Sequence, residues 1–365
     1  MLSSMFLDHD LPYWLAWNRS PKIGPTRFAQ LRRAFASLQE AWESSGQQLR
    51  QIGFDDKLVN EIILHRQQTD VNQTYQEIQN LKLNITTAAS QDYPKLLKEI
   101  ADPPPVLYWR GNWQCLNFPC LATVGARRMT SYGQQVVAKL IPTLAQAGLT
   151  IISGLAYGID AACHQATVMS GGKTVAVLAS GLDQIYPSAN RHLAQKILEA
   201  GGLLLSEFAP GTPPLKQHFP IRNRIIAGLA RATLVIEAAT TSGALITAKQ
   251  ALEYNRDVFA VPGSILGELS IGTNELIKLG ATPVVKAEDI LYSFNLKPQE
   301  QASASRPLFG VEAQIVALLK NEPLHSDEIA RSLQLPAGDI TAKLTLLELE
   351  GVIKEAGQHK FISVS

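Results

Sequence analysis

Cysteine, net charge and long apolar runs are all scarce in this chain, and each scarcity excludes a class of protein. Only Cys115, Cys120 and Cys163 are present, an odd number without zinc-type partners at short spacing, so neither a disulfide framework nor a cysteine-ligated zinc site is expected. The formal net charge is +1, so any polyanion site must be a local cluster. No apolar run could span a bilayer and no secretory signal opens the chain, so a cytoplasmic protein that does not enter the membrane is predicted.

Apolar residues are abundant by contrast. They make up 46% of the 365 residues while charged residues make up 18%, a balance that allows a large core and two or three domains. Residues 1–80 repeat apolar side chains at helical spacing, which predicts a helical domain of helix-hairpin-helix or SAM-like type. The turn at residues 23–25 resembles a helix-hairpin-helix turn, whose backbone N–H groups can hold a DNA phosphate. The alternative is a plain helical packing domain. Because only one such turn is present, the sequence favours this alternative.

The middle of the chain, residues 83–294, alternates apolar segments with amphipathic helical patterns. Uninterrupted apolar strands that alternate with helices are typical of a parallel sheet buried on both faces, so an α/β core is predicted. The expected strands are residues 106–109, 121–124, 149–152, 174–178, 203–205, 233–236, 258–261 and 283–285.

The last part of the chain is predicted to form a separate small domain. Residues 295–310 are polar and contain Pro and Ser, which indicates a linker. Residues 311–365 contain three helical patterns followed by two short strands, the arrangement of a winged helix. The third helix carries Glu348 and Glu350 beside Lys343, a poor charge pattern for gripping DNA. A protein-contact role for this domain is therefore as well founded as a DNA-binding one.

Glycine-containing loops follow several core strands, and each precedes a helix. Glycine lets the backbone approach a ligand, and a helix N-terminus offers free N–H groups to an anion, so these loops predict a phosphate-binding edge of the sheet. Tight turns without a ligand are the alternative. The candidate residues in these loops are Gly125, Arg127, Arg128, Ser153, Gly154, Ser242 and Gly243.

A basic run with an aromatic residue follows the fourth strand of the alternating core and opens a helix. This position places it at the same sheet edge as the glycine loops, where open α/β sheets bind ligands. Basic residues interleaved with an aromatic are what a groove for single-stranded nucleic acid requires. A core-packed ring beside solvated arginines is the alternative. The candidate residues of the run are Lys216, His218, Phe219, Arg222, Asn223 and Arg224.

Asp160 and His164 stand four residues apart at the start of a predicted helix. This spacing would allow an acid–base pair. The sequence favours the simpler interpretation, in which the aspartate caps the helix and the histidine packs.

A series of motifs in unbroken order from about residue 92 to 291 resembles one bacterial family. It includes DPPPVLYWRG, TVGARRMTSYG, SGLAYGIDAACH, HFPIRNRIIAGL and VIEAATTSGALITA, and it is similar to the DNA-processing protein A family, also called DprA or Smf. The resemblance implies a Rossmann-like core that binds single-stranded DNA without base preference, forms homodimers and hands the strand to the RecA recombinase during natural transformation. It implies no cofactor and no catalytic activity. The helical front and winged-helix tail fit the larger members.

The family positions that line the DNA pocket correspond to Arg127, Lys216 and Phe219, and the other residues of the basic run are an extension from the local sequence. Many members have Ser where this chain has Ala126, which removes one hydroxyl donor. An enzyme is the alternative, because the core is distantly similar to phosphoribohydrolases of nucleoside monophosphates. Their PGGxGT loop lacks its second glycine in the VPGS segment here, so the sequence favours a mediator.

Overall fold

The computed structural model describes residues 2–20, 22–298, 308–320, 322–349, 352–357 and 360–363. The chain divides into two compact units, residues 1–298 and 299–365. Most of the predicted linker, residues 299–307, lies outside the described residues. No described helix combines the length and the apolarity that crossing a membrane would require.

The first unit is built on one sheet of nine strands, with the spatial order β1-β2-β6-β5-β4-β3-β7-β8-β9. From β6 to β9 all neighbours are parallel, whereas β2 pairs antiparallel with both β6 and β1. The strands are β1 Asn84–Thr87, β2 Val106–Gly111, β3 Cys120–Val124, β4 Thr150–Ser153, β5 Thr174–Val177, β6 Leu203–Ser206, β7 Ala232–Val235, β8 Asp257–Ala260 and β9 Thr282–Pro283.

Strand β1 and the antiparallel edge were not predicted from the sequence. The β1 segment is four residues long and contains one apolar side chain, Ile85, so it gives almost no hydrophobic pattern. Its structure comes from pairing with β2, in which Ile85 lies opposite Tyr108. An edge strand of this kind depends on its partner more than on its own residues.

The order of the parallel strands places a switch point between β3 and β7. The chain leaves β3 for β4, β5 and β6 on one side, then returns to place β7, β8 and β9 on the other. The loops that follow β3 and β7 therefore run to opposite faces and leave a crevice at the carboxyl edge of the sheet.

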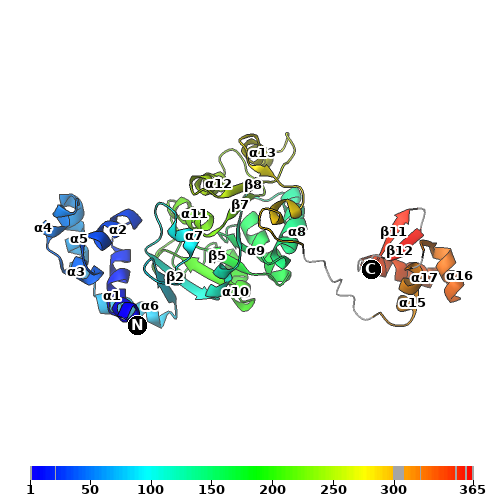
Figure 1. Ribbon diagram of the computed structural model, residues 1–365, viewed down its shortest axis with the longest axis horizontal. Helices are drawn as coiled ribbons and strands as arrows, with labels where there is room; N and C mark the ends of the chain where they lie inside the picture. Colours follow the sequence, from blue (N-terminus) through cyan, green and yellow to red (C-terminus); the bar gives the residue numbers. More distant parts are fainter. Residues whose placement is uncertain are drawn as a thin grey trace. The chain divides into compact units, whose positions relative to one another are not determined.

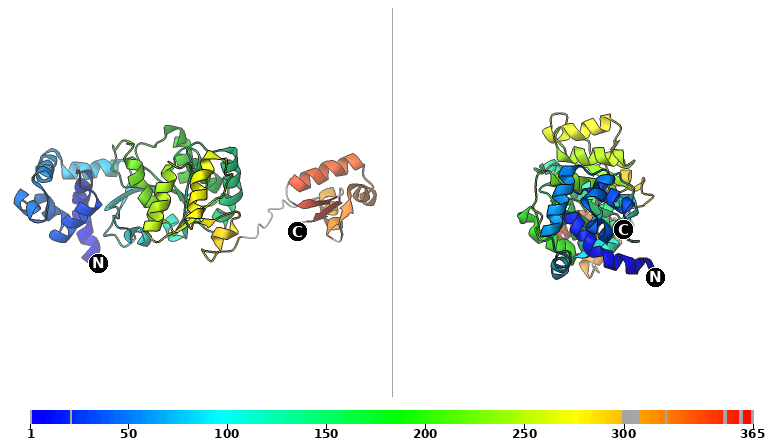
Figure 2. Two further views of the ribbon diagram at one scale, coloured as in Figure 1. Left: turned by 90° about the horizontal axis from the view of Figure 1, so that it is seen from above. Right: turned by 90° about the vertical axis from the view of Figure 1, so that its left-hand side faces the viewer.

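Two layers of helices enclose the sheet because neighbouring residues on each strand point to opposite faces. Leu121 and Ile151 pack toward α8 and α9, whereas Ala122 and Ile152 pack toward α11 and α12. Figures 1 and 2 show the strands between these layers. The helices of this region are α7 Lys95–Lys98, α8 Ser131–Gln146, α9 Ile159–Met169, α10 Arg191–Glu199, α11 His218–Leu229, α12 Gly243–Glu253, α13 Ile271–Lys278 and α14 Glu288–Leu291.

The N-terminal region is helical, as predicted, and has an aromatic core. Trp14 packs against Phe28 with the rings tilted by 41° and their centroids 5.1 Å apart, and Trp17 meets Trp42 edge-on at the same distance. The Tyr108 hydroxyl donates to Asn18 across 2.8 Å and so joins this region to the sheet. The helices are α1 Leu2–Arg19, α2 Pro25–Ala34, α3 Leu38–Glu43, α4 Gly46–Gln51, α5 Asp56–Gln68 and α6 Val71–Asn80.

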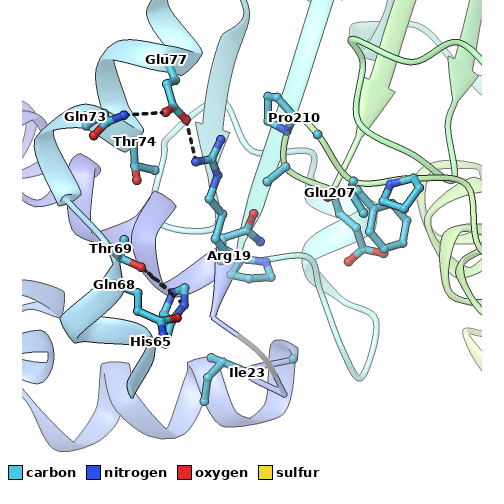
Figure 3. Close-up of a pocket in the computed structure, with 18 of the residues that line it drawn as sticks. Arg19, Ile23, His65, Gln68, Thr69, Gln73, Thr74, Glu77, Glu207 and Pro210 are labelled. Carbon is cyan, nitrogen blue, oxygen red and sulfur yellow. Dashed lines mark hydrogen bonds and ion pairs between the residues drawn. The ribbon is translucent and has the colours of Figure 1, made fainter. Parts of the chain in front are cut away.

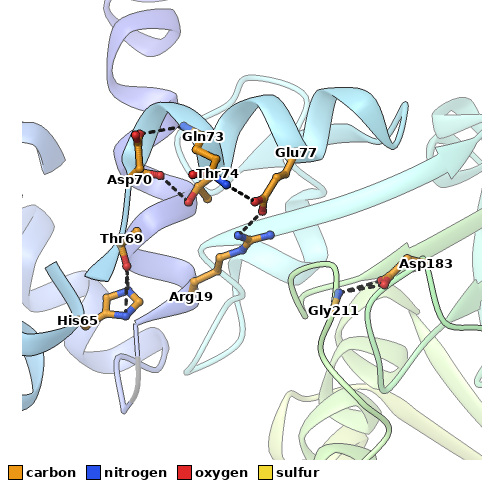
Figure 4. A network of polar contacts seen from close by, with 9 residues as sticks. All are labelled: Arg19, His65, Thr69, Asp70, Gln73, Thr74, Glu77, Asp183 and Gly211. Carbon is orange, nitrogen blue, oxygen red and sulfur yellow. Dashed lines mark hydrogen bonds and ion pairs between the residues drawn. The ribbon is translucent and has the colours of Figure 1, made fainter. Parts of the chain in front are cut away.

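A hollow of about 890 Å³ lies between these helices and the loop after β6. Figure 3 shows Arg19 and Glu77 on the helical side and Glu207 and Pro210 on the loop side. Arg19 pairs with Glu77 at 2.9 Å, while the backbone of Gly211 donates to the Asp183 carboxylate at 3.0 Å (Figure 4). The ionic groups of this hollow are thus largely engaged within the protein.

The second unit is a winged helix, which completes the predicted fold class: a Rossmann-like α/β core with a helical front and a winged-helix tail. On α17, Glu348 is exposed, and Lys343 pairs with Glu312 at 3.9 Å. Glu350 lies outside the described residues. The elements are α15 Val311–Leu319, α16 Ser326–Leu333 and α17 Ala337–Leu349, with a sheet of β10 Leu324–His325, β12 Lys360–Ser363 and β11 Ile353–Gly357.

His164 on α9 is fully buried between the helix and the sheet. Its Nδ1 lies 2.7 Å from the Thr174 hydroxyl, and burial, aided by the charge of Arg222, lowers the pKa of His164 from 6.5 to about 3. The ring stays neutral in the folded protein, whereas the unfolded chain takes up a proton below about 6.5. His164 therefore leaves stability unchanged above that value and lowers it progressively as the pH falls toward 3.

Replacing His164 by Gln should make the protein less sensitive to acid. The free energy of unfolding of the variant relative to wild type should rise by up to about 1.4 kcal/mol per pH unit below 6.5, because the proton uptake by the unfolded chain is removed. Denaturant unfolding at about pH 7.5 and about pH 5 measures this difference. The exposed His192→Gln is the control, and equal pH dependence of both variants would contradict the account.

Candidate nucleic-acid interface

A cleft of about 620 Å³ lies at the switch point of the sheet. Its walls are the loop after β3, the loop between β7 and α12, the first turns of α11 and Tyr186 from the loop after β5. Of the sequence-predicted residues, the cleft brings together Gly125, Arg127, Arg128, Lys216, Phe219, Arg222, Asn223, Ser242 and Gly243.

Phe219 supplies an aromatic surface in this cleft. The half-buried ring has the Arg127 guanidinium carbon 4.9 Å from its centroid and the Tyr186 ring at 5.7 Å in a T-shaped arrangement. Arg127 and Lys216 are exposed, and no hydrogen bond or ion pair within the described residues engages their charged groups. The cleft thus combines an aromatic surface with two cations free to bind an anion.

Close packing between loops fixes the floor of the cleft. A Cβ on Gly125 would lie 2.6 Å from Ile159, so only glycine allows the loop after β3 to lie against α9. Gly158 has φ +72°, and a Cβ there would lie 2.3 Å from the carbonyl oxygen of Ala126. These contacts hold the backbone before Arg127 in one place.

Arg222 lines the cleft, but its guanidinium is buried and connects neighbouring backbone segments through hydrogen bonds. Its side chain is 4% exposed and donates to the carbonyls of Gly154, at 2.7 Å, and Val177. The Asp160 carboxylate accepts from the backbone of Gly154 at 3.1 Å and of Ala156 at 3.4 Å. Burial raises the pKa of Asp160 against the opposing charge of Arg222, and it lowers the pKa of Arg222 to about 10.

Three candidate residues have side chains that contact other protein groups and do not line the cleft. Arg224 is 4% exposed and pairs with Glu207 and Asp102, because its position on α11 turns it beneath the helix. The Ser153 hydroxyl is buried and donates to the Thr123 carbonyl at 2.6 Å. His218 stacks on Phe208 with centroids 4.3 Å apart and does not line the cleft.

Asp160 and His164 do not form an acid–base pair. Asp160 binds backbone N–H groups ahead of α9, while His164 binds the Thr174 hydroxyl. His164 packs as predicted. Asp160 does not cap α9, because its carboxylate accepts from N–H groups ahead of the helix and the N-terminus of α9 has no side-chain cap hydrogen bond. No cluster of three or more possible metal ligands occurs among the residues that the structure describes.

Sequence reasoning missed Tyr186, which is 43% exposed and lines the cleft. The signal was available, since this aromatic residue stands in the loop after β5 and so at the same edge as the other candidates.

Comparison with protein families decides the affiliation of the chain. The model described as DNA recombination-mediator protein A matches residues 84–295, and the DprA winged helix domain matches residues 299–358. The chain belongs to the DNA recombination-mediator protein A family. Members of this family are DNA-processing proteins.

Relatives in this family extend over most of the chain. Protein Smf of Synechocystis sp. is 37% identical over 94% of this chain and 96% of its own length. The DNA processing protein DprA of Streptococcus pneumoniae is 50% identical over 55% of this chain and 71% of its own length.

Two solved structures of the family share the fold. The X-ray structure of DprA from Streptococcus pneumoniae aligns with a TM-score of 0.68 at 38% identity, covering 77% of this chain and 97% of that one. The structure of DNA processing protein A from Helicobacter pylori, described as revealing a unique single-stranded DNA binding mode, aligns with a TM-score of 0.53 at 30% identity, covering 58% and 96%.

Replacing Gly154 by Ala should disturb the buried hydrogen bonds of Arg222 and destabilise the protein by about 1–3 kcal/mol, since the new Cβ would lie 2.5 Å from the Arg222 guanidinium. Thermal unfolding followed by circular dichroism measures the loss. Gly24→Ala is the matched control because no atom lies within 4 Å of its Cβ position. Equal melting temperatures for the two variants would show that the close packing of Gly154 against Arg222 does not contribute to stability.

Proposed function

We propose that the cleft binds single-stranded DNA without sequence preference and that the protein is a non-catalytic recombination mediator. It loads RecA recombinase on incoming DNA in natural transformation, in the cytoplasm and as a homodimer. The observation that carries the proposal is that one cleft contains the Phe219 ring with the Arg127 guanidinium over it and the exposed cation of Lys216. The solved relative from Helicobacter pylori, described with a single-stranded DNA binding mode, supports the ligand.

The chemistry of the cleft suits a strand rather than a duplex. Bases in a duplex are already stacked and paired, whereas an unpaired base can turn toward a half-buried ring. Cations bind every phosphate alike, and an aromatic face accepts any base. Asn223, Ser242 and Gly243 add polar contacts to the backbone of the strand, so the interface holds DNA without selecting its sequence.

The enzyme alternative gains no support from the cleft. The carboxylate among the cleft-lining residues belongs to Asp160. It accepts hydrogen bonds from backbone N–H groups and faces the charge of Arg222. A hydrolase of nucleoside monophosphates needs an acidic or basic group that can exchange a proton with substrate. A mediator requires the opposite, since it must leave the strand intact.

We also propose a division of labour along the chain. Residues 83–294 form the DNA-binding core, residues 1–80 a helical domain, residues 295–310 a linker and residues 311–365 a domain for protein contact. The exposed face of α17 has Thr341, Thr345, Leu346 and Glu348, which suits a protein surface better than a phosphate backbone.

Replacing Lys216 by Ala should weaken binding to single-stranded DNA and make log affinity less dependent on log salt by about 0.7, since one phosphate contact is lost. Phe219→Ala should cost roughly 1–3 kcal/mol if a base stacks on the ring. Fluorescence titrations at several salt concentrations measure both effects.

Lys173→Ala is the control for position, because Lys173 immediately precedes β5 at the opposite edge of the sheet. Its ammonium lies 3.2 Å from the Phe118 ring centroid, so thermal unfolding of this variant is measured beside its binding. Equal losses in the Lys173 and Lys216 variants would argue against the cleft. A Phe219→Ala protein that unfolds earlier but binds normally would assign the ring to the core.

The mediator role predicts that the protein shortens the lag in RecA ATP hydrolysis on strands coated with single-strand-binding protein. Arg127→Ala should fail to do so, because the protein cannot take hold of the strand. An unchanged lag with wild type, or an equally short lag with Arg127→Ala, would refute the mediator proposal for this chain.

A further inference from the structure

A second hollow, of about 920 Å³, adjoins the cleft. Arg128 and Leu269 line both spaces, so the two meet at these side chains. The remaining wall comes from Tyr132 at the start of α8, Glu237 after β7 and the loop after β8. A polymer that leaves the cleft past Arg128 enters this hollow.

Arg128 suits the passage of a charged backbone. It is exposed, and no hydrogen bond or ion pair in the described part of the chain involves its guanidinium. An unengaged cation at the junction of two hollows can hold the phosphate that connects nucleotides in each of them.

Tyr132 supplies an aromatic surface in the second hollow. Its hydroxyl donates to the Pro262 carbonyl at 2.6 Å, which fixes the ring, yet the residue remains 43% exposed. A fixed and accessible ring is suited to stacking on a base because little side-chain freedom is lost on binding.

The loop after β8 presents two aliphatic side chains close to this hollow. Ile265 and Leu266 are 89% and 92% exposed at the tip of a turn closed by a bond from the Gly267 backbone to the Ser264 carbonyl at 3.0 Å. Asn274 anchors the turn through two bonds with the backbone of Gly263, at 3.1 and 3.0 Å. A rigid turn that holds apolar groups in solvent indicates a surface that another molecule covers.

The carboxylates around the hollow decide which part of a nucleotide it can accept. Glu237 is 2% exposed and accepts from the backbone and hydroxyl of Thr130, while Glu268 is exposed. Both repel phosphates, which are therefore confined to Arg128. Neither opposes an uncharged base.

We propose that this second hollow, formed by Arg128, Tyr132 and the turn 264–267, is an exit site for the same DNA strand. The proposal rests on the proposed function of the cleft. The strand leaves the cleft with a phosphate on Arg128, a following base stacks on Tyr132, and Ile265 and Leu266 cover that base from the rim. The protein thereby holds a longer segment than the cleft alone.

The test is affinity as a function of strand length, with oligothymidylates from about 4 to about 16 nucleotides. Wild type should gain affinity once the strand is long enough to pass Arg128. Tyr132→Ala should match wild type on the shortest strand that binds and be about fivefold weaker or more on long ones. Tyr132→Phe keeps the ring and should stay within about twofold of wild type at every length.

The outcomes separate this site from the cleft. Absence of binding by wild type at all lengths would refute the proposed function itself. Normal binding of Tyr132→Ala at all lengths, or an equal loss at all lengths, would refute the exit site while leaving the cleft in place. A Leu266→Lys variant that binds long strands normally but no longer dimerises or engages the recombinase would assign the turn to a protein partner and also refute the proposal.

Discussion

The buried guanidinium of Arg222 is the contact on which the cleft depends. It ties the loop after β4, at Gly154, and the end of β5, at Val177, to the helix that carries Phe219. Asp160 faces it and collects the backbone N–H groups of the same loop. Removing either charge would leave the other buried without compensation, a costly state for a folded protein. The pair therefore stabilises one arrangement of the loop after β4, the end of β5 and α11.

These buried contacts fix the positions of the exposed groups in the cleft. Arg127 lies over Phe219 because the loop after β3 is packed against α9, and Lys216 precedes the same helix that Arg222 holds. A strand that binds here meets cations and a ring already in position, so less ordering opposes binding. The cleft therefore combines buried charges that hold the backbone in place with exposed charges that would meet phosphate under the proposed function.

The sequence predicted the parallel strands well because their apolar runs are continuous, and it placed Arg127, Lys216 and Phe219 at one edge because parallel strands end together. It could not distinguish the different roles of Lys216, Arg222 and Arg224 in the basic run. Arg224 has the same local pattern as the others, but its partners Glu207 and Asp102 stand 17 and 122 residues away. Only tertiary structure brings these groups together. Strand β1 was not predicted for the same reason. It forms because it pairs with β2, and its own residues show almost no strand pattern.

Photocrosslinking tests the central claim most directly. A strand with iodinated uracil at each position in turn, irradiated with the full-length protein and mapped by mass spectrometry, reports which side chains touch bases. The account predicts crosslinks to Phe219 and Tyr186, the two aromatic residues of the cleft. Crosslinks confined to the helical N-terminal region or to α17, with none in the cleft, would contradict it.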